Sequence, residues 1–384
     1  MTHPMAAVLS LADWITPKSD SIVVQTPTWL DDQGREVVRA LRRQGHVRVT
    51  WLVSERLGGE DTFESVPVRL KSSPRGLGSY LRAKVVLHTH GLGNLTEFPS
   101  RRKAFLNLWH GMPLKRLPSA TATSRRQTTR TIATSDGHAG HIAGSWGLAA
   151  AQVAVTGLPR NDVLVRARTT ATPAIDELAG GKPVVVWLPT FRASTRGDGP
   201  PDGCETGNVF QLPGVTTSHV NAILRELGIF LIVKPHRNSP RVETVAASHI
   251  AVWDDAALDA NGLTVYELLA RSTALITDYS SVWVDYLLVD RPIIFAVADL
   301  AAYQAGRGFY VADLADQLPG PRVTDLAELR DALRTLVSGE DDWQPVRQAM
   351  TPDHHAHVDG ASADRVARIA LSLLGSRLPA GNDR

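Results

Sequence analysis

The sequence predicts an α/β protein of two consecutive Rossmann-like domains that face a cleft. Three observations lead to this prediction. Short apolar runs alternate with segments of helical spacing, which is typical of parallel sheets covered by helices. The alternation restarts after residues 166–182, a stretch rich in Thr, Ala, Pro and Gly that has the composition of a linker. The length of 384 residues suits two domains of ~150–200 residues each.

The first domain is expected over residues 1–165. It opens with a β-α-β pattern, which indicates a parallel sheet with a crossover helix. The strands of this domain are expected at residues 21–25, 47–53, 84–88, 105–109, 131–134 and 152–156, its first helix at residues 31–44, and a glycine-interrupted helix or loop at residues 135–148.

The second domain is expected over residues 182–360, followed by a C-terminal helix and tail over residues 361–384. Residues 192–209 contain six glycines and prolines, which predicts a long loop. Strands are expected at residues 184–188, 230–234, 274–277 and 292–297, and helices at residues 282–289, 325–337 and 362–374.

A phosphate seat is predicted between the strand at 274–277, which ends in Thr277, and the following helix. Asp278, Ser280 and Ser281 occupy this turn. Ligands of open α/β sheets bind at the carboxyl ends of strands. Two serines at the start of a helix add backbone N–H groups, hydroxyl donors and the positive end of the helix dipole. The turn is therefore expected to hold a phosphate or diphosphate.

A histidine follows the strand at 105–109. His110 precedes Gly111, which permits close backbone approach, and Lys115 lies five residues further on. The ordinary pKa of histidine is ~6.5, so that His110 is a candidate general base. The alternative is a structural histidine in a loop.

Cationic side chains follow two strands of the second domain. Lys234, His236 and Arg237 come after the strand at 230–234, and one histidine with two fixed cations suits an anionic leaving group. Thr190 and Arg192 place a hydroxyl and a guanidinium after the strand at 184–188. Surface solubility is the competing explanation for the first group.

Composition narrows the class of protein. Cys204 is the single cysteine, which excludes an internal disulfide framework and a cysteine metal site and favours a reducing, cytoplasmic setting. His138 and His141 lie three residues apart, but no third ligand lies at metal-site spacing. The histidines within residues 354–357 are likewise not expected to bind a metal. We expect no metal. No stretch reaches the ~18 apolar residues that span a bilayer, and the N-terminus lacks a basic leader, so that neither secretion nor membrane spanning is expected.

Charge is distributed unevenly between the two halves. Residues 1–170 hold 23 Lys and Arg against 12 Asp and Glu, whereas residues 171–384 hold 18 against 27. Such asymmetry indicates that the first half meets an anionic partner, for which lipid headgroups, a phosphate polymer and nucleic acid are the candidates. The alternative is a set of solvated helix faces.

Taken together, the motifs resemble one family. In order along the chain they read LWHGMPLK, TGLPRND, LPTFR, ITDYSSVWVDYLLVDRPIIF, AGRGFY, LPGP and VDGASADRV. This series, from about residue 84 to residue 369, is similar to the CDP-glycerol glycerophosphotransferases, the teichoic acid primases and polymerases of bacterial cell walls. The resemblance implies two domains of the GT-B type, with a CDP-alcohol held mainly by the C-terminal domain.

The resemblance also implies roles for individual residues. His110 looks like the family's base for the acceptor hydroxyl, and His236 like its second essential histidine, which contacts the donor diphosphate. With the strand-end positions, the expected substrate-binding residues are Gly111, Lys115, Thr190, Arg192, Lys234, Arg237, Thr277, Asp278, Ser280 and Ser281.

The reaction expected from the resemblance is transfer of glycerol phosphate, or ribitol phosphate, from its CDP-activated form to a hydroxyl of a lipid-linked acceptor, with release of CMP. CDP-glycerol or CDP-ribitol is the donor substrate and no cofactor is expected. The basic first half then meets an anionic membrane rather than nucleic acid, at the inner face of the cell membrane. Two alternatives stay open: a GT-B sugar transferase or epimerase, and a non-catalytic module that binds a nucleotide or a polyanion.

Overall fold

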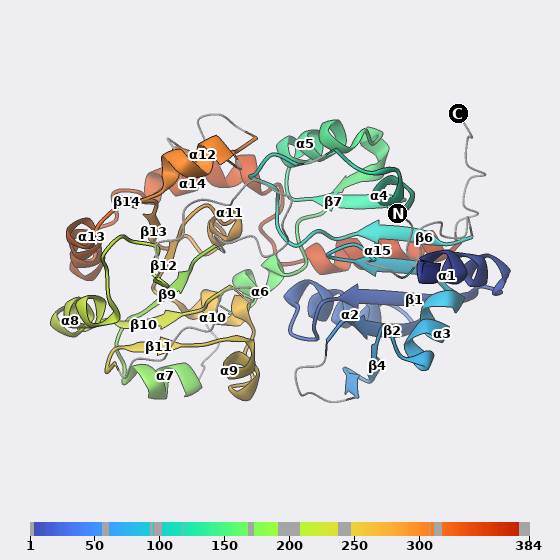
Figure 1. Ribbon diagram of the computed structural model, residues 1–384, viewed down its shortest axis with the longest axis horizontal. Coiled ribbons are helices and arrows are strands. Elements are labelled where there is room, and N and C mark those ends of the chain that lie inside the picture. The colour runs from blue at the N-terminus through green and yellow to red at the C-terminus, as the bar shows by residue number, and fades with distance from the viewer. Residues whose placement is uncertain are drawn as a thin grey trace. The chain divides into compact units, whose positions relative to one another are not determined.

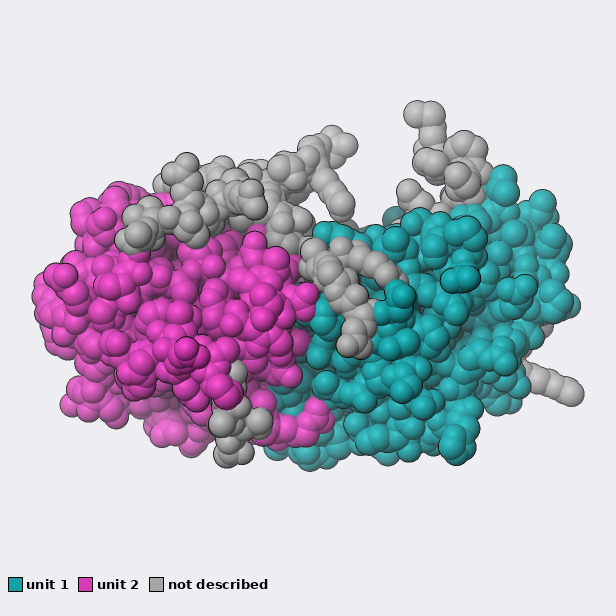
Figure 2. All heavy atoms as spheres, turned by 90° about the horizontal axis from the view of Figure 1, so that it is seen from below, with its two compact units in different colours: residues 1–112, 118–163, 353–384 teal, residues 113–117, 164–352 magenta. Residues whose placement is uncertain are grey.

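The chain folds into two compact units, which Figure 2 colours separately. Unit 1 contains residues 1–112, 118–163 and 353–384, and unit 2 contains residues 113–117 and 164–352. Each unit is built around its own sheet, flanked by helices (Figure 1). The computed structural model describes residues 4–55, 61–92, 95, 102–117, 119–167, 173–190, 208–236, 247–306, 308–310 and 317–375.

The described part of unit 1 contains an eight-stranded sheet in the order β3-β4-β2-β1-β5-β6-β7-β8. Neighbouring strands are parallel, except that β3 and β4 are antiparallel at one edge. The strands are β1 (Ser19–Thr26), β2 (Arg48–Val53), β3 (Thr62–Phe63), β4 (Val66–Leu70), β5 (Ala83–His88), β6 (Ala104–Asn107), β7 (Arg130–Ala133) and β8 (Val153–Val155).

Several helices of unit 1 begin at residues whose side chains cap them. Asp31 accepts a hydrogen bond from Gly34 N at the start of α2, and Ser73 does the same for α3 from Gly76 N. Ser135 caps α5, which ends at Gly147 in the left-handed region with φ 63°. The helices are α1 (Pro4–Ile15), α2 (Asp32–Gln44), α3 (Pro74–Arg82), α4 (Ala122–Arg126), α5 (Asp136–Trp146), the 3-10 turn η1 (Ala150–Gln152), α6 (Asn161–Arg166), which leads into unit 2, and α15 (Ser362–Gly375).

The described part of unit 2 contains six parallel strands in the order β11-β10-β9-β12-β13-β14. They are β9 (Val184–Leu188), β10 (Phe230–Val233), β11 (Ile250–Val252), β12 (Ala274–Thr277), β13 (Ile293–Ala296) and β14 (Arg322–Val323). The helices are α7 (Pro173–Ala179), α8 (Thr217–Leu227), α9 (Asp255–Ala260), α10 (Val265–Arg271), α11 (Val282–Tyr286), α12 (Leu300–Gly306), α13 (Leu326–Ser338) and α14 (Gln344–His354), which leads back to unit 1.

Continuous apolar runs form the central strands of unit 2 because both faces of a parallel sheet are covered. On one face, Trp187 packs at a ring-centroid distance of 5.0 Å from Phe210. Leu224 of α8 and Leu329 of α13 belong to the same buried cluster. This core holds the ends of β9 and β12 at a fixed spacing.

Both sheets have the strand order of a Rossmann fold, which confirms the predicted fold class. In each, the chain starts in the middle, moves to one edge and then returns to the other side of the first strand. The order reverses between β1 and β5 in unit 1 and between β9 and β12 in unit 2. A crevice for ligands is expected where the carboxyl ends of these neighbours diverge.

Several boundaries differ from those predicted. The strand predicted at 105–109 ends at Asn107, because Trp109 has φ 55° and cannot continue an extended strand. The helix predicted at 282–289 ends as α-helix at Tyr286, and residues 287–290 form tighter turns with bonds to the third preceding carbonyl. The predicted linker at 166–182 includes the helix α7. Residues 353–384 belong to unit 1 rather than to the preceding unit.

The return of the chain to unit 1 depends on a buried carboxylate. Both oxygens of Asp162 accept hydrogen bonds at the start of α15, from Ser362 N at 2.9 Å and from Ala363 N at 2.8 Å. These N–H groups have no partner within the helix. Gly157, with φ 78°, approaches Ser362 so closely that a Cβ atom would lie 2.3 Å from its Oγ. α15 then packs against α2 and β5.

Replacing Asp162 by Ala is expected to lower the free energy of unfolding by about 1–3 kcal/mol, because two buried N–H groups lose their acceptor. Urea denaturation followed by tryptophan fluorescence measures this change. Asp331→Ala is the matched control, since its ion pair with Arg334 is exposed and contributes at most about 1 kcal/mol. Equal effects of the two substitutions would contradict this role for Asp162.

Candidate active site

The carboxyl edge of the unit 1 sheet carries His110. The side chain follows β6, and the intervening Trp109 is held in the left-handed region by Asn107, whose Oδ1 accepts from Trp109 N at 3.0 Å. Gly111, with φ 142°, also has a positive φ. The backbone therefore turns sharply on both sides of His110, and the imidazole is exposed at the sheet edge.

A buried amide supports this turn from behind. Gln33, in the first turn of α2, donates from Nε2 to Leu108 O at 2.7 Å and to Trp109 O at 3.3 Å. Its Oε1 accepts from Arg160 N at 2.9 Å, while the Arg160 guanidinium donates to His110 O at 2.7 Å. The main chain on both sides of His110 is thus fixed by side chains of two other segments of unit 1.

The proton position on His110 follows from one contact. His110 Nδ1 lies 3.3 Å from Thr89 O. A carbonyl oxygen can only accept, so that Nδ1 carries the proton and Nε2 is the basic nitrogen of the neutral ring. This tautomer is the one that a general base acting through Nε2 requires.

A second histidine stacks on the first. The rings of His90 and His110 have centroids 4.3 Å apart and an angle of 18° between their planes. His90 Nδ1 lies 2.8 Å from the Thr89 hydroxyl, which donates to Asp31 Oδ2 at 3.4 Å. Burial raises the pKa of Asp31, against the opposing effect of its hydrogen bond from Gly34 N. The stack restricts the orientation of His110 and connects it to the start of α2.

His88 has a different role from its exposed neighbours. Its side chain is buried at the end of β5, and Nε2 donates to Gln127 O at 3.1 Å. Burial lowers the pKa of His88 from 6.5 to about 4, although the Gln127 carbonyl acts in the opposite direction. His88 is therefore neutral at physiological pH and belongs to the packing of β5.

This burial predicts a pH dependence of stability. As the pH falls from 6.5 to about 4, the unfolded chain binds a proton at His88 before the folded chain does, so that the free energy of unfolding decreases. His88→Gln is expected to reduce that slope, by up to ~3 kcal/mol across the interval. Urea denaturation at successive pH values measures it, with exposed His46→Gln as the control. An unchanged slope in His88→Gln would refute the assignment.

The carboxyl edge of the unit 2 sheet joins two of the predicted residues directly. Thr190, after β9, donates from its backbone N to Asp278 Oδ2 at 2.9 Å and from its hydroxyl to Asp278 Oδ1. Thr277, at the end of β12, donates to Leu188 O at 2.8 Å. Asp278 is buried. These bonds bridge β9 and β12 where the strand order reverses, so that Asp278 ties the two strand ends together.

The two predicted phosphate-binding serines lie beside this bridge. Ser280 and Ser281 are partly exposed, immediately before the short helix α11. Ser281 is the N-cap residue, and its side chain makes no capping hydrogen bond. Tyr279, by contrast, is buried and donates to Asp299 Oδ1 at 2.9 Å. Ser280 Oγ accepts from Val282 N at 3.4 Å, so that the turn leaves both serines partly exposed while the Tyr279 ring is anchored.

Lys115 meets this turn through aromatic rings within unit 2. It pairs with Phe309 in an antiparallel bridge, and its Nζ lies 5.3 Å from the centroid of the Tyr303 ring. Tyr303 stacks on Tyr279 at 4.0 Å, and Phe309 lies 5.9 Å from Tyr279. Three of the sequence motifs, containing Lys115, Tyr279 and Phe309, therefore converge on one aromatic cluster.

The remaining predicted residues are Lys234, His236, Arg192 and Arg237. Lys234 is buried and forms an ion pair with Asp255 at 2.7 Å, which reduces the charge it presents to a phosphate. His236 is exposed and lies three residues after β10, which ends at Val233. Arg192, Arg237 and most of the predicted loop at 192–209 lie outside the described residues.

Metal-ligating side chains do not gather in groups of three or more anywhere in the described ranges. His138 and His354 lie in contact within unit 1, with Nε2 and Nδ1 3.1 Å apart. None of the helices that the structure describes is long and apolar enough to cross a membrane.

Comparison with known proteins identifies the family. Residues 12–372 match the family described as CDP-Glycerol:Poly(glycerophosphate) glycerophosphotransferase. The chain belongs to this family. The match covers both units and every motif named above, and the predicted resemblance is confirmed.

Two relatives within this glycerophosphotransferase family differ in how much of their length the chain spans. A teichoic acid glycerol-phosphate transferase of Staphylococcus aureus is 25% identical over 365 residues, which is 88% of both chains. A teichoic acid poly(glycerol phosphate) polymerase of Staphylococcus epidermidis is 27% identical over 291 residues, 68% of this chain but only 38% of the polymerase. The chain therefore spans well under half of that longer relative.

A solved structure supports the architecture. The wall teichoic acid polymerase TagF superposes with a TM-score of 0.74 and 21% identity, covering 97% of this chain and 94% of the TagF chain. The predicted GT-B type of fold is confirmed by this similarity.

Sequence reasoning did not find the residues that support His110. Gln33 and Asp31 lie in an ordinary helix start, and Arg160 in what could be a simple turn. His90 was visible as a second histidine after a strand, and the adjacency of β5 and β6 was the missing information. A polar side chain that follows the end of a strand is the signal by which His90 can be recognised.

Proposed function

We propose that the protein transfers glycerol phosphate, or ribitol phosphate, from its CDP-activated form to a hydroxyl group of a lipid-linked acceptor, with release of CMP. The family match over residues 12–372 carries this proposal. In the reaction, the acceptor oxygen forms a bond to the β-phosphorus of the donor. The bond from that phosphorus to the bridging oxygen breaks, and CMP leaves with the electron pair.

Unit 1 is proposed to supply the base. His110 carries its proton on Nδ1, so that Nε2 can accept the proton of the attacking hydroxyl. The imidazolium that forms is stabilised by its contact with the Thr89 carbonyl. Arg160 and Gln33 hold the main chain of this turn, which keeps the base oriented through the transfer.

Unit 2 is proposed to bind the donor at the reversal between β9 and β12. The hydroxyls of Ser280 and Ser281 suit the diphosphate, while Asp278 keeps Thr190 and the two strand ends together. His236, three residues after the neighbouring strand β10, is proposed to meet negative charge on the departing CMP. Lys234 is assigned a supporting role because Asp255 neutralises it.

The acceptor and the location are further parts of the proposal. The excess of 23 Lys and Arg over 12 Asp and Glu in residues 1–170 favours a phosphate-bearing acceptor at an anionic membrane surface. Attachment at the inner face of the cell membrane brings the chain to a lipid-linked substrate.

The reaction class is tested by incubating the full chain with a prenyl-diphosphate-linked acceptor analogue and, in parallel, CDP-glycerol, CDP-ribitol or a UDP-sugar. We expect CMP release that requires both a CDP-polyol and the acceptor, measured by ion-exchange chromatography. Turnover of the UDP-sugar instead would support a sugar transferase or epimerase. Nucleotide binding without CMP release from any donor would refute the transferase proposal.

His110→Ala is expected to reduce CMP release by about 10²–10⁴-fold, since a positioned base is lost. The Kd of CDP-glycerol should change by less than about tenfold, or ~1.4 kcal/mol, because the donor is assigned to unit 2. Titration calorimetry measures the affinity and single-turnover kinetics the rate. His219→Ala, an exposed histidine of α8, is the matched control. A fully active His110→Ala variant would remove the base from the mechanism.

A further inference from the structure

Two exposed histidines form one stack at the carboxyl edge of the unit 1 sheet. The centroids of the His90 and His110 rings lie 4.3 Å apart, with an angle of 18° between the ring planes. Two imidazolium rings at this spacing repel each other, so that the pair binds a first proton more readily than a second. Which ring takes the first proton therefore decides whether His110 is available as a base.

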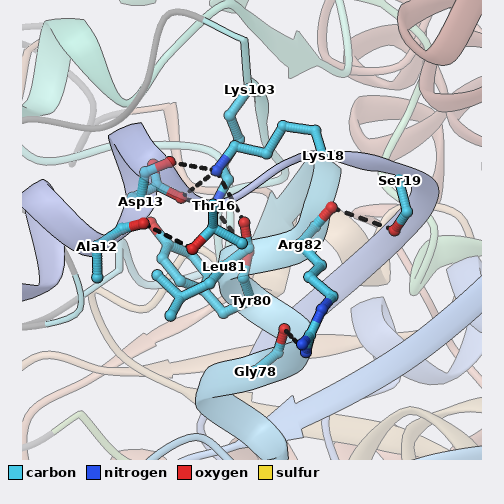
Figure 3. Close-up of polar contacts among 10 residues, drawn as sticks. All are labelled: Ala12, Asp13, Thr16, Lys18, Ser19, Gly78, Tyr80, Leu81, Arg82 and Lys103. Carbon is cyan, nitrogen blue, oxygen red and sulfur yellow. Dashed lines mark hydrogen bonds and ion pairs between the residues drawn. The ribbon is translucent and has the colours of Figure 1, made fainter.

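The register of β5 and β6 sets the position of the stack. His88 and Asn107, the last residues of these two strands, pair with each other. Lys103 directly precedes β6, and its Nζ donates to Tyr80 O at 2.7 Å and forms an ion pair with Asp13 Oδ1 at 2.6 Å (Figure 3). β6 is thus held at both ends, and the residues that follow it keep a fixed position beside those that follow β5.

A buried glutamine of β1 holds the main chain around His90. Gln25 O accepts from Thr89 N at 3.4 Å, and Gln25 Nε2 donates to Gly91 O at 3.3 Å. The residues on both sides of His90 are therefore fixed, and the protein itself positions this ring against His110.

A chain of hydrogen bonds connects His90 to a carboxylate. Both oxygens of Asp31 accept, Oδ1 from Gly34 N at 3.0 Å and Oδ2 from the Thr89 hydroxyl at 3.4 Å, which fits the ionised form. Because the Thr89 hydroxyl donates its hydrogen to Asp31, its oxygen accepts from His90 Nδ1 at 2.8 Å. His90 Nδ1 therefore carries a proton, and the negative charge at the end of the chain stabilises the imidazolium form of His90.

The surroundings of His110 differ from those of His90. His110 Nδ1 lies 3.3 Å from the Thr89 carbonyl oxygen, and the Arg160 guanidinium donates to His110 O at 2.7 Å. A fixed cation beside His110 disfavours a positive charge on its ring. Burial raises the pKa of Asp31, while Arg160 acts in the opposite direction. His88, behind the pair on β5, is buried and neutral.

We propose that His90 binds the first proton of the stacked pair and thereby keeps His110 neutral, as the base, to a lower pH than an isolated histidine. His90 is thus a positioning residue that acts through His110. When His110 Nε2 takes the proton of the acceptor hydroxyl, the pair carries two charges, and the second proton passes to solvent from the exposed ring. The inference rests on the proposed function for the acceptor hydroxyl as the proton source, whereas the order of protonation is a property of the protein alone.

NMR titration of the full chain, labelled at histidine Cε1, measures the order of protonation. As the pH falls, we expect His90 to titrate first and His110 about one pH unit lower, the scale set by two unit charges ~4 Å apart near water. His90→Phe keeps a ring in the stack and removes its charge, so that the titration of His110 should move up by about one pH unit. Asp31→Asn keeps the helix cap and removes the carboxylate, so that the titration of His90 should move down. Exposed His46→Phe and Asp20→Asn, near the amino ends of β2 and β1, are the matched controls.

The pH profile of CMP release connects this order to the reaction. The value of kcat/KM decreases on the acid side as His110 becomes protonated, and His90→Phe should move that limb up by about one pH unit with little change in the KM of CDP-glycerol. His90→Ala removes the ring as well as the charge, and should also lower kcat because His110 loses its stacking partner.

Four results would overturn the proposal. They are an unchanged titration of His110 in His90→Phe, His110 titrating before His90, equal losses of kcat in His90→Phe and His90→Ala with an unmoved acid limb, and a raised KM of the acceptor as the sole effect. The third result would leave His90 a structural role alone, and the fourth would make it a substrate contact. The expected titrations without CMP release from any CDP-polyol would support the order of protonation and refute the proposed function.

Discussion

The parallel pairing of β1 with β5 and of β9 with β12 is the constraint on which both candidate edges depend. Parallel neighbours end at the same edge, and at a reversal of strand order the chains that follow them diverge. In unit 2 the gap is bridged by Asp278, which accepts two hydrogen bonds from Thr190. In unit 1, Thr89 follows β5 and connects the start of α2 with His90 and His110. The chemistry of each edge is thus arranged by backbone pairing before any ligand arrives.

The sequence predicted most of this arrangement because the central strands are long apolar runs. The strands at 184–188 and 274–277 have the predicted bounds. The short strands β3, β4, β11 and β14, at or next to the sheet edges, were not predicted, since two to five residues with partial exposure carry too little pattern. Strand order could not be read from the sequence either, and the stacking of His90 on His110 depends on it. The ion pair between Lys234 and Asp255 could not be predicted either, because Asp255 comes from another element.

The motifs shared with the family serve two different physical purposes. Those containing His110, Thr190 and Ser280 lie at strand ends that suit substrate chemistry. TGLPRND and VDGASADRV instead meet each other: Gly157 makes room for Ser362, and Asp162 caps α15. Resemblance over a whole chain therefore mixes residues that react with residues that hold the fold, and only contacts separate them. Lys115 belongs to both classes, since its backbone pairs with that of Phe309 while its charge lies over the Tyr303 ring.

The cap on α15 has a consequence for biosynthesis. Asp162 and Ser362 are 200 residues apart in sequence, with unit 2 between them. A ribosome that has completed the eight described strands of unit 1 must still make all of unit 2 before α15 can cover α2. During that interval the nascent unit 1 exposes apolar surface, and Asp162 has no helix to cap. Contacts of such long sequence separation also form slowly. The order of synthesis therefore makes the last helix the step that completes the first unit.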